Sequence, residues 1–239
     1  MMKKVNPEIS IVIPIHNEEG ILSAAVHDLL AKMPRLGRKF EIVLAENGSS
    51  DKTIELAVEL SDAHPEVSTF SAPAPDYGLA LREGIERALG RYVMCDEIDI
   101  CDVGFYERAL ELLDAERADL VVGSKVMRGA FDRRPFSRRA ATHVINGLLR
   151  ILLGFKGTDT HGLKAFRRDA LLEVARLCIV NRDLFASELV IRAERSGVRV
   201  VEIPITIVEK RPPSIDLVRR VPAVFKGLAR LVAAIRLGV

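Results

Sequence analysis

The sequence predicts an α/β protein with a mostly parallel central sheet and helices on both of its faces. Up to residue 124, short and almost wholly apolar segments alternate with segments whose apolar residues lie three or four positions apart. Strands that are apolar on both sides are typical of a parallel sheet buried between two layers of helices. The composition agrees: 49% of the 239 residues are hydrophobic but only 5% are aromatic, so aliphatic side chains must build the core.

The strands and helices of the first half follow one another regularly. The first apolar run ends at Pro14, and helical spacing of apolar residues begins after Glu18. The segment Asn-Gly-Ser-Ser-Asp that ends at Asp51 has the composition of a turn followed by a helix N-cap. The same patterns predict strands at 10–14, 40–45, 67–71, 91–95 and 119–123, and helices at 18–33, 53–61, 78–89 and 104–115.

The second half is richer in helix and in basic residues. We expect a loop at 128–135, a helix at 137–153 and an amphipathic helix at 185–196. A short strand at 162–166 is expected at an edge of the sheet. The β-rich segment 198–208 contains Pro204, which indicates an edge strand or a bulge because proline cannot donate a ladder hydrogen bond.

Residues 215–239 have the pattern of a basic amphipathic helix that follows a single domain at 1–214. The helix is expected to be continuous at least after Pro222. Its apolar stripe either packs on the protein's own sheet or lies on an anionic membrane surface, and the sequence leaves both alternatives open. The stripe consists of Leu217, Val221, Val224, Leu228, Leu231 and Ile235.

Composition disfavours several classes of protein. No apolar run approaches the roughly 18 residues that a membrane-spanning helix needs. No uninterrupted apolar segment follows the first lysines, so a secretory signal is not expected. The three cysteines are odd in number and lack metal-ligand spacing, which indicates a reducing compartment and a cytoplasmic location. Basic stretches without interleaved aromatic residues disfavour nucleic acid as a partner.

Opposite charges are separated along the chain, although the formal net charge is only +2. Residues 125–168 contain 11 basic and two acidic side chains, and residues 210–239 contain seven basic side chains and one acidic one. The remaining residues are therefore strongly acidic. This separation predicts an anionic partner that faces the second half of the protein.

Acidic side chains follow three of the predicted strands. Glu18 and Glu46 come after the first two strands, and Glu97 and Asp99 come after the fourth. Ligands of doubly wound sheets bind beyond the carboxyl ends of the strands. Carboxylates gathered there repel one another and need a cation or hydrogen-bond donors. A hard divalent ion that bridges carboxylates and a diphosphate would meet that need.

Five segments resemble, in order, the sequence blocks of family 2 glycosyltransferases, and they look most like the dolichol-phosphate mannose synthase branch. The segments are SIVIPIHNEEG, EIVLAENGSSDKT, YGLALREGIERALGRYVMCDEIDI, DTHGLKAFRRDAL and VEIPITIVEKRPPS. The resemblance implies a Rossmann-like sandwich of the GT-A type. It also implies an inverting enzyme that moves a sugar from a GDP- or UDP-sugar to a polyprenyl or dolichyl phosphate, with Mg²⁺ or Mn²⁺ as cofactor.

The resemblance also assigns roles to residues of the donor side, which it places in 1–124. Glu46 matches the acidic residue that reads the base, normally the first Asp of Asp-Asp-Gly-Ser. Glu97 and Asp99 match an Asp-x-Asp motif that binds the metal, with Asp99 the stronger candidate and with Glu in place of the first Asp. The nucleotide-binding positions are Pro14, His16, Glu18, Glu46, Asn47, Gly48 and Ser49.

The acceptor side, 125–214, takes further assignments from the resemblance. Lys125, Arg133 and Ser137 match positions that contact the acceptor phosphate. Arg211 and Ser214 match a loop that grips phosphate, although its usual glycine is missing here. Asp159 matches the acidic residue of an Asp-x-x-Ser-Gly-Phe block, in which His161 and Leu163 replace Ser and Phe.

Electrostatics favour such a site independently of the resemblance. Release of a nucleoside diphosphate builds negative charge, which a metal on Asp99 and the nearby Arg211 would stabilise. A phosphate acceptor is largely ionised at neutral pH and needs no general base. A hydroxyl acceptor would need one, and Glu188 and Asp159 are the two candidates.

Two other functions stay open. One is transfer to a hydroxyl of a glycolipid or polysaccharide, and the other is a non-catalytic relative that binds sugar nucleotides. A nucleotide-dependent dehydrogenase is disfavoured because the first strand is not followed by Gly-x-Gly-x-x-Gly. For the enzyme we expect peripheral association with the cytoplasmic face of a membrane, and a membrane-embedded partner protein that completes the acceptor site is left open.

Overall fold

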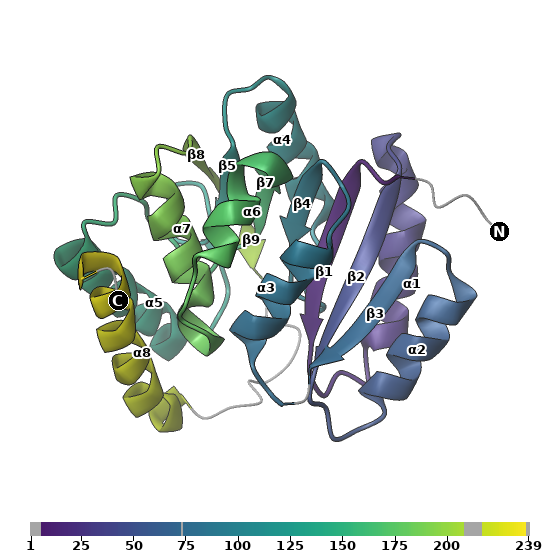
Figure 1. Ribbon diagram of the computed structural model, residues 1–239, viewed down its shortest axis with the longest axis horizontal. Coiled ribbons are helices and arrows are strands. Elements are labelled where there is room, and N and C mark those ends of the chain that lie inside the picture. Colours follow the sequence, from purple (N-terminus) through teal and green to yellow (C-terminus); the bar gives the residue numbers. More distant parts are fainter. Residues whose placement is uncertain (1–5, 73, 208–216, 238–239) are drawn as a thin grey trace.

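The computed structural model describes residues 6–72, 74–207 and 217–237, and it contains the predicted α/β sheet (Figure 1). Seven strands form the main sheet in the order β3-β2-β1-β4-β7-β5-β8. Its strands are β1 (Ile9–Ile15), β2 (Phe40–Asn47), β3 (Val67–Ala72), β4 (Tyr92–Cys95), β5 (Leu120–Ser124), β7 (Lys164–Arg167) and β8 (Val200–Pro204). A second, two-stranded sheet pairs β6 (Phe131–Asp132) with β9 (Thr206–Ile207). The five strands expected in the first half are thereby confirmed.

Helices cover both faces of the main sheet. One apolar core joins β1 and β2 to α1, α2 and α4, and a second core joins the opposite face to α3 and to the later helices. The α-helices are α1 (Leu22–Lys32), α2 (Thr53–Ala63), α3 (Tyr77–Arg87), α4 (Val103–Asp114), α5 (Phe136–Leu153), α6 (Arg168–Arg176), α7 (Phe185–Arg195) and α8 (Leu217–Leu237), with short 3-10 helices η1 (Met33–Leu36) and η2 (Arg182–Leu184).

Strand β7 corrects the expectation of an edge strand at 162–166. It lies between β4 and β5 and runs antiparallel to both, with Lys164 opposite Cys95 on one side and Val122 on the other. The charged residues at both ends of this short strand suggested exposure. Lys164 is nevertheless buried, together with Ala165 and Phe166.

Strand β8 confirms the expected edge position of the segment at 198–208. It pairs with β5 alone in the main sheet, and Pro204 is its last residue. The segment expected as a loop at 128–135 contains the two-residue strand β6. Residues 208–216 lie outside the described part of the chain.

Helix α8 packs on the protein itself. Leu228, Leu231 and Ala234 are buried, and α8 contacts α5 and η2 at the end of the molecule opposite α1 and α2 (Figure 1). From Val224 onward the apolar stripe therefore follows the internal alternative, although it packs on helices and not on the sheet. The side chains of Leu217 and Val221 are outside the described part. No helix among the described residues is long and apolar enough to span a bilayer.

Close backbone contact between Gly162 and Gly123 fixes the entry of the chain into β7. A Cβ atom on Gly162 would lie 1.5 Å from the carbonyl oxygen of Gly123. We predict that Gly162→Ala destabilises the fold by about 3 kcal/mol, because the backbone must shift to relieve the overlap. Chemical denaturation measures the loss.

The matched control for this prediction is Gly147→Ala in α5, where an added Cβ has no neighbour within 4 Å. It should stabilise the protein by roughly 0.5–1 kcal/mol, since alanine is the better helix former. Equal stability of wild type and Gly162→Ala would contradict the described contact.

Candidate active site

The loops after β1 and β2 are joined by hydrogen bonds at the carboxyl ends of these parallel strands. The Nδ1 atom of His16 lies 2.9 Å from the carbonyl oxygen of Asn47, and the Asn47 side chain donates to the carbonyl oxygen of Ile15 over 2.9 Å. The backbone N–H of Asn17 donates to the hydroxyl of Ser49 over 3.0 Å. The predicted nucleotide-binding residues of these two loops are thus brought together.

Glu46 is buried at the end of β2, and both oxygens of its carboxylate accept hydrogen bonds from neighbouring residues. One oxygen accepts a hydrogen bond from the backbone N–H of Ser49 over 2.6 Å, and the other accepts one from the hydroxyl of Ser71. Gly48 between them has a φ of +69°, which glycine adopts readily. Contact between Glu46 and a base stays a prediction.

Asp96, at the end of β4, has a structural role. Its buried carboxylate accepts hydrogen bonds from the backbone N–H groups of Glu97, Cys101 and Asp102 and from the Tyr106 hydroxyl, at 2.6–3.3 Å. Burial raises the pKa of Asp96 to about 7, although these donors favour its ionised form. Because all four donors converge on it, Asp96 organises the acidic turn and is not available as a ligand.

Glu97 and Asp99 remain as the available carboxylates of this turn. Glu97 is exposed and Asp99 is half-buried, and neither carboxylate accepts a hydrogen bond from the described residues. Surrounding protein raises the pKa of Glu97, and the neighbouring charge of Asp99 adds to that rise, whereas Lys125 opposes it. Glu97 is therefore open to solvent and lies among charged neighbours of both signs.

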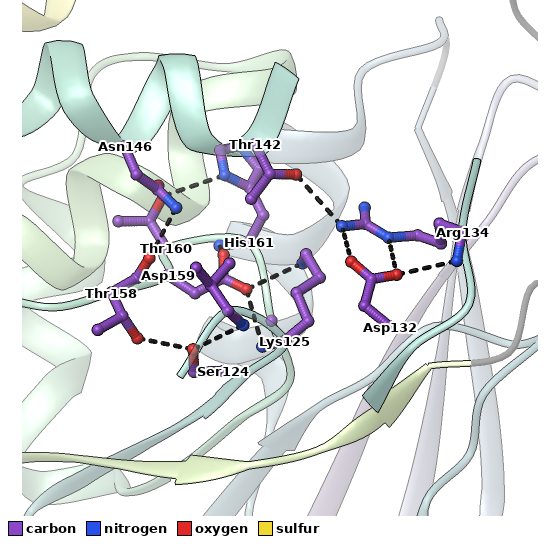
Figure 2. Close-up of polar contacts among 12 residues, drawn as sticks. Ser124, Lys125, Asp132, Arg134, Thr142, Asn146, Thr158, Asp159, Thr160 and His161 are labelled. Atoms are coloured by element: carbon purple, nitrogen blue, oxygen red, sulfur yellow. Dashed lines mark hydrogen bonds and ion pairs between the residues drawn. The ribbon is translucent and has the colours of Figure 1, made fainter. Parts of the chain in front are cut away.

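The opposite wall of the site is a buried ion pair between Lys125 and Asp159 (Figure 2). The Lys125 Nζ atom lies 3.2 Å from Oδ2 of Asp159, and the two side chains are 7% and 0% exposed. The same oxygen accepts from the backbone N–H of Lys125, and Oδ1 accepts from that of His161. Burial opposes ionisation of Asp159, but Lys125 and these donors outweigh it and lower the pKa.

The loop that carries Asp159 is fixed from several directions. The Glu202 carboxylate of β8 accepts from the backbone N–H groups of Thr158 and Asp159 at 2.7 and 3.0 Å. The Asn146 side chain of α5 donates to the carbonyl oxygen of Thr158, and the Ser124 hydroxyl pairs with that of Thr158, both at 2.7 Å (Figure 2). Asp159 is therefore held rigidly before any ligand binds.

A polar pocket of about 150 Å³ opens beside Lys125. Helix α5 contributes Arg139, Thr142 and His143 to its lining. Asp132 also lines it and binds Arg134 through two hydrogen bonds of 2.9 and 2.7 Å, while Arg134 reaches Thr142 (Figure 2). The charge of Asp132 is thus met by Arg134, and that of Lys125 by Asp159, which leaves Arg139 and His143 as the other basic side chains of the lining.

Lys164 is buried at the base of the site, where its ammonium group donates to the carbonyl oxygen of Gly162 over 2.8 Å. Burial lowers the pKa of Lys164 to about 8, although Cys95, Asp159 and Glu97 act in the opposite direction. Its positive charge lies near two carboxylates of the site.

The other predicted site residues lie elsewhere. Glu188 is buried in α7, where its carboxylate accepts from the backbone N–H groups of Ile179 and Val180 and pairs with Arg192. The Arg133 guanidinium lies over the ring of Phe131, and Ser137 is exposed in the first turn of α5. Pro14 is buried within β1. Arg211 and Ser214 lie outside the described residues.

The family model for glycosyl transferase family 2 matches residues 10–175, which include the loops after β1, β2 and β4 and the loop before β7. The chain belongs to glycosyl transferase family 2. This result confirms the resemblance predicted from the five sequence blocks.

Curated relatives of this chain include proteins that it matches over most of their length and proteins that it matches over less than half. Two relatives align with most of the chain and most of their own length. An undecaprenyl-phosphate mannosyltransferase of Micrococcus luteus is 30% identical over 83% of each protein. A polyprenol monophosphomannose synthase of Mycolicibacterium smegmatis is 31% identical over 84% of this chain and 77% of the relative. Glycosyltransferase AglD of Haloferax volcanii is 30% identical over 89% of this chain. The chain spans only 35% of AglD, and 48% of a second Haloferax volcanii relative, the hexosyltransferase Agl6.

Solved structures show the same fold at lower identity. Glucosyl-3-phosphoglycerate synthase of Mycobacterium tuberculosis, in complex with Mn²⁺, UDP-glucose and phosphoglyceric acid, matches 96% of this chain with a TM-score of 0.68 and 20% identity. The complex of that enzyme with UDP gives a TM-score of 0.66. The GT-A type of fold expected from the sequence is therefore confirmed.

Sequence reasoning missed Lys164 and the pocket residues of α5. A lysine beside apolar residues in a short strand was one available signal for Lys164. For α5, Thr142 and His143 follow Arg138 and Arg139 by one helical turn, which places them on nearby parts of the helix surface. Which part faces the pocket depends on how α5 packs, and the sequence pattern did not show that.

We predict that Asp159→Asn destabilises the protein by about 3 kcal/mol at pH 7, because Lys125 is left as a buried charge without its partner. The folded-state pKa of Asp159 lies below its ordinary value of 3.8, so its charge stabilises the fold above about pH 4. That contribution is lost as the pH falls through the folded-state pKa. Denaturation at several pH values should show the difference between wild type and variant narrowing below pH 4.

The control is Asp169→Asn, which removes the carboxylate of an exposed ion pair with Arg167. It should change stability by less than about 1 kcal/mol, as surface pairs do. If Asp159→Asn and Asp169→Asn lost similar amounts of stability, the larger contribution of the buried Lys125–Asp159 pair would be contradicted.

Proposed function

We propose that the protein is a metal-dependent, inverting glycosyltransferase that moves a sugar from a GDP- or UDP-sugar to a polyprenyl phosphate. The observation that carries the proposal is the basic pocket beside the Lys125–Asp159 pair, which lies in the same site as the acidic turn after β4. The two relatives that match over most of their length, and whose names state transfer to or synthesis of a polyprenyl phosphate sugar, support it.

The donor side suits a divalent cation. Glu97 and Asp99 present hard carboxylate oxygens, and their mutual repulsion is relieved when a cation binds between them. Among the described residues no three His, Cys, Asp or Glu side chains gather as a complete metal site. We propose that Glu97 and Asp99 would hold the ion together with the diphosphate of the donor. The bound Mg²⁺ or Mn²⁺ would supply positive charge where the leaving diphosphate gains negative charge.

The acceptor side suits a phosphate better than a hydroxyl. Lys125, Arg139 and His143 line the pocket, and the charge of Asp132, which also lines it, is met by Arg134. A phosphate ionised at neutral pH attacks without a general base, so these residues need only bind and orient it. Attack from the face opposite the leaving diphosphate would invert the anomeric carbon.

The two carboxylates named as bases for a hydroxyl acceptor are both engaged. Asp159 accepts from Lys125 and His161, and Glu188 accepts from two backbone N–H groups and Arg192. A base must have a lone pair directed at the proton that it removes. These contacts favour the phosphate acceptor over the hydroxyl alternative.

The location follows from the acceptor. A polyprenyl chain stays in a bilayer, so we propose that the enzyme works as a peripheral protein on the cytoplasmic face of the membrane. A membrane-embedded partner protein stays a prediction.

A donor-by-acceptor screen tests the proposed function. We predict that purified protein with Mg²⁺ or Mn²⁺ transfers labelled sugar from a GDP- or UDP-sugar only when polyprenyl phosphate is present. Polyprenol, which has a hydroxyl in place of the phosphate, should give no product. Chromatography of the labelled lipid measures both, and transfer to polyprenol with none to polyprenyl phosphate would overturn the acceptor assignment.

Asp99→Asn provides the metal control in the same assay. It should lower turnover at least 100-fold, because one of the two available carboxylates is lost, while the melting temperature stays near that of wild type. The matched substitution Asp62→Asn, on an exposed position of α2, should leave turnover unchanged. Full activity of Asp99→Asn would remove it from the metal site.

A further inference from the structure

Helix α5 exposes a row of apolar side chains to solvent. Phe136, Val144 and Ile151 are 82%, 60% and 78% exposed, and they are among the most exposed large apolar residues of the described chain. Their spacing, completed by Ala140 and Gly147, places them on one side of the helix. We call these five residues the apolar row of α5. Single exposed apolar residues are ordinary, but a continuous row on one helix indicates a contact surface.

The apolar row lies beside the proposed acceptor pocket on the same helix. Thr142 and Arg139 line that pocket, and so does His143, which neighbours Val144. Going around α5, the order is therefore Thr142, then Arg139 and His143, then the apolar row. Around the helix axis, the side that lines the pocket is therefore followed by basic residues and then by the apolar row. All three lie within about half of the circumference of the helix.

One flank of the row is basic. Helix α5 contains three arginines and no Asp or Glu, and Arg139 and Arg150 are exposed along one flank of the row with His143 between them. Helix α8, which contacts α5, also contains no Asp or Glu and exposes Lys226 and Arg230. An apolar face bordered by basic residues has the chemistry of a helix that lies on an anionic bilayer.

We propose that the apolar row of α5 docks on the surface of an anionic lipid bilayer and so presents the pocket to lipid-linked phosphates. This inference rests on the proposed function, which supplies the lipid acceptor. The phosphate enters the pocket past Arg139 and His143, while the apolar chain stays in the bilayer along the row. The membrane contact is thus assigned to α5, whereas the apolar stripe of α8 is largely used in packing.

Vesicle binding tests the docking surface directly. Wild-type protein is mixed with vesicles of neutral phosphatidylcholine or with vesicles that contain about 30% phosphatidylglycerol, and bound protein is measured by co-sedimentation. We expect binding to the anionic vesicles that weakens at high salt, and at least a tenfold loss of binding for the triple variant Phe136→Ser, Val144→Ser, Ile151→Ser. Because these side chains are exposed, the variant should keep the wild-type melting temperature.

A matched variant controls for a general loss of apolar surface. Ile54→Ser with Val58→Ser changes two exposed residues of α2, which are 38% and 46% exposed and lie on the other side of the sheet. This variant should bind vesicles as wild type does. Equal binding by wild type and the triple variant would overturn the proposal. So would a wild-type dimer that the triple variant dissociates, since the row would then be a protein interface.

A soluble acceptor separates this inference from the proposed function. With a short prenyl phosphate that dissolves in water, the triple variant should transfer sugar at the wild-type rate, because its pocket is intact. With long-chain polyprenyl phosphate in anionic vesicles, its rate should fall at least tenfold. Loss of both activities in the variant would contradict the docking role. Absence of transfer by the wild type to either acceptor would contradict the proposed function, while the vesicle measurement would still decide on docking.

Discussion

Strand β7 enters the sheet between β4 and β5 against the direction of both neighbours. In a parallel sheet the loop that follows each strand reaches the carboxyl rim. An antiparallel strand reverses this relation, so it is the loop before β7 that lies beside the end of β4. Asp159 and His161 come from that loop, and Lys164 is the first residue of the strand. The geometry of the whole site depends on this one insertion.

The electrostatics of the site follow from the same insertion. Glu97 and Asp99 lie in the turn after β4, Lys125 and the basic residues of α5 line the pocket beside Asp159, and Lys164 is buried close to Glu97 and Lys125. The buried carboxylates of Asp96 and Asp159 each accept several hydrogen bonds. These contacts hold the turn after β4 and the loop before β7 in place. Charges that are fixed before ligands bind do not have to reorganise during the reaction, which is how preorganised sites stabilise developing charge.

The sequence predicted those parts of the protein that depend on local pattern. Apolar runs and helical spacing identified the five strands of the first half, whereas the metal site expected from the acidic residues after β4 stays a prediction. Lys164 shows why β7 was misplaced: a lysine is seldom buried, so the pattern indicated an edge, yet nearby carboxylates make its burial tolerable. Among the acidic residues after β4, the pattern did not distinguish Asp96, which caps the turn, from Asp99, which stays available.

The lining of the pocket beside Lys125 depends on the orientation of one helix. The resemblance implies acceptor contacts at Arg133 and Ser137, which stay a prediction, and the pocket is lined by Arg139, Thr142 and His143, about one and a half turns further along. Only the packing of α5 decides which of its faces meets the pocket and which meets solvent. The apolar stripe of α8 is a second case in which packing decides. Its spacing predicted a helix, but its burial depends on how α8 packs against α5 and η2.

The linkage in the reaction product tests whether the acceptor phosphate attacks the anomeric carbon, because it shows which group of the acceptor became joined to the sugar. The product made from polyprenyl phosphate and a sugar nucleotide with a known anomeric configuration is purified and studied by phosphorus and proton NMR. We predict coupling between the acceptor phosphorus and the anomeric proton, and an anomeric configuration opposite to that of the donor. A product that keeps the anomeric configuration of the donor, or release of free sugar with the polyprenyl phosphate unchanged, would contradict an inverting transfer to the phosphate.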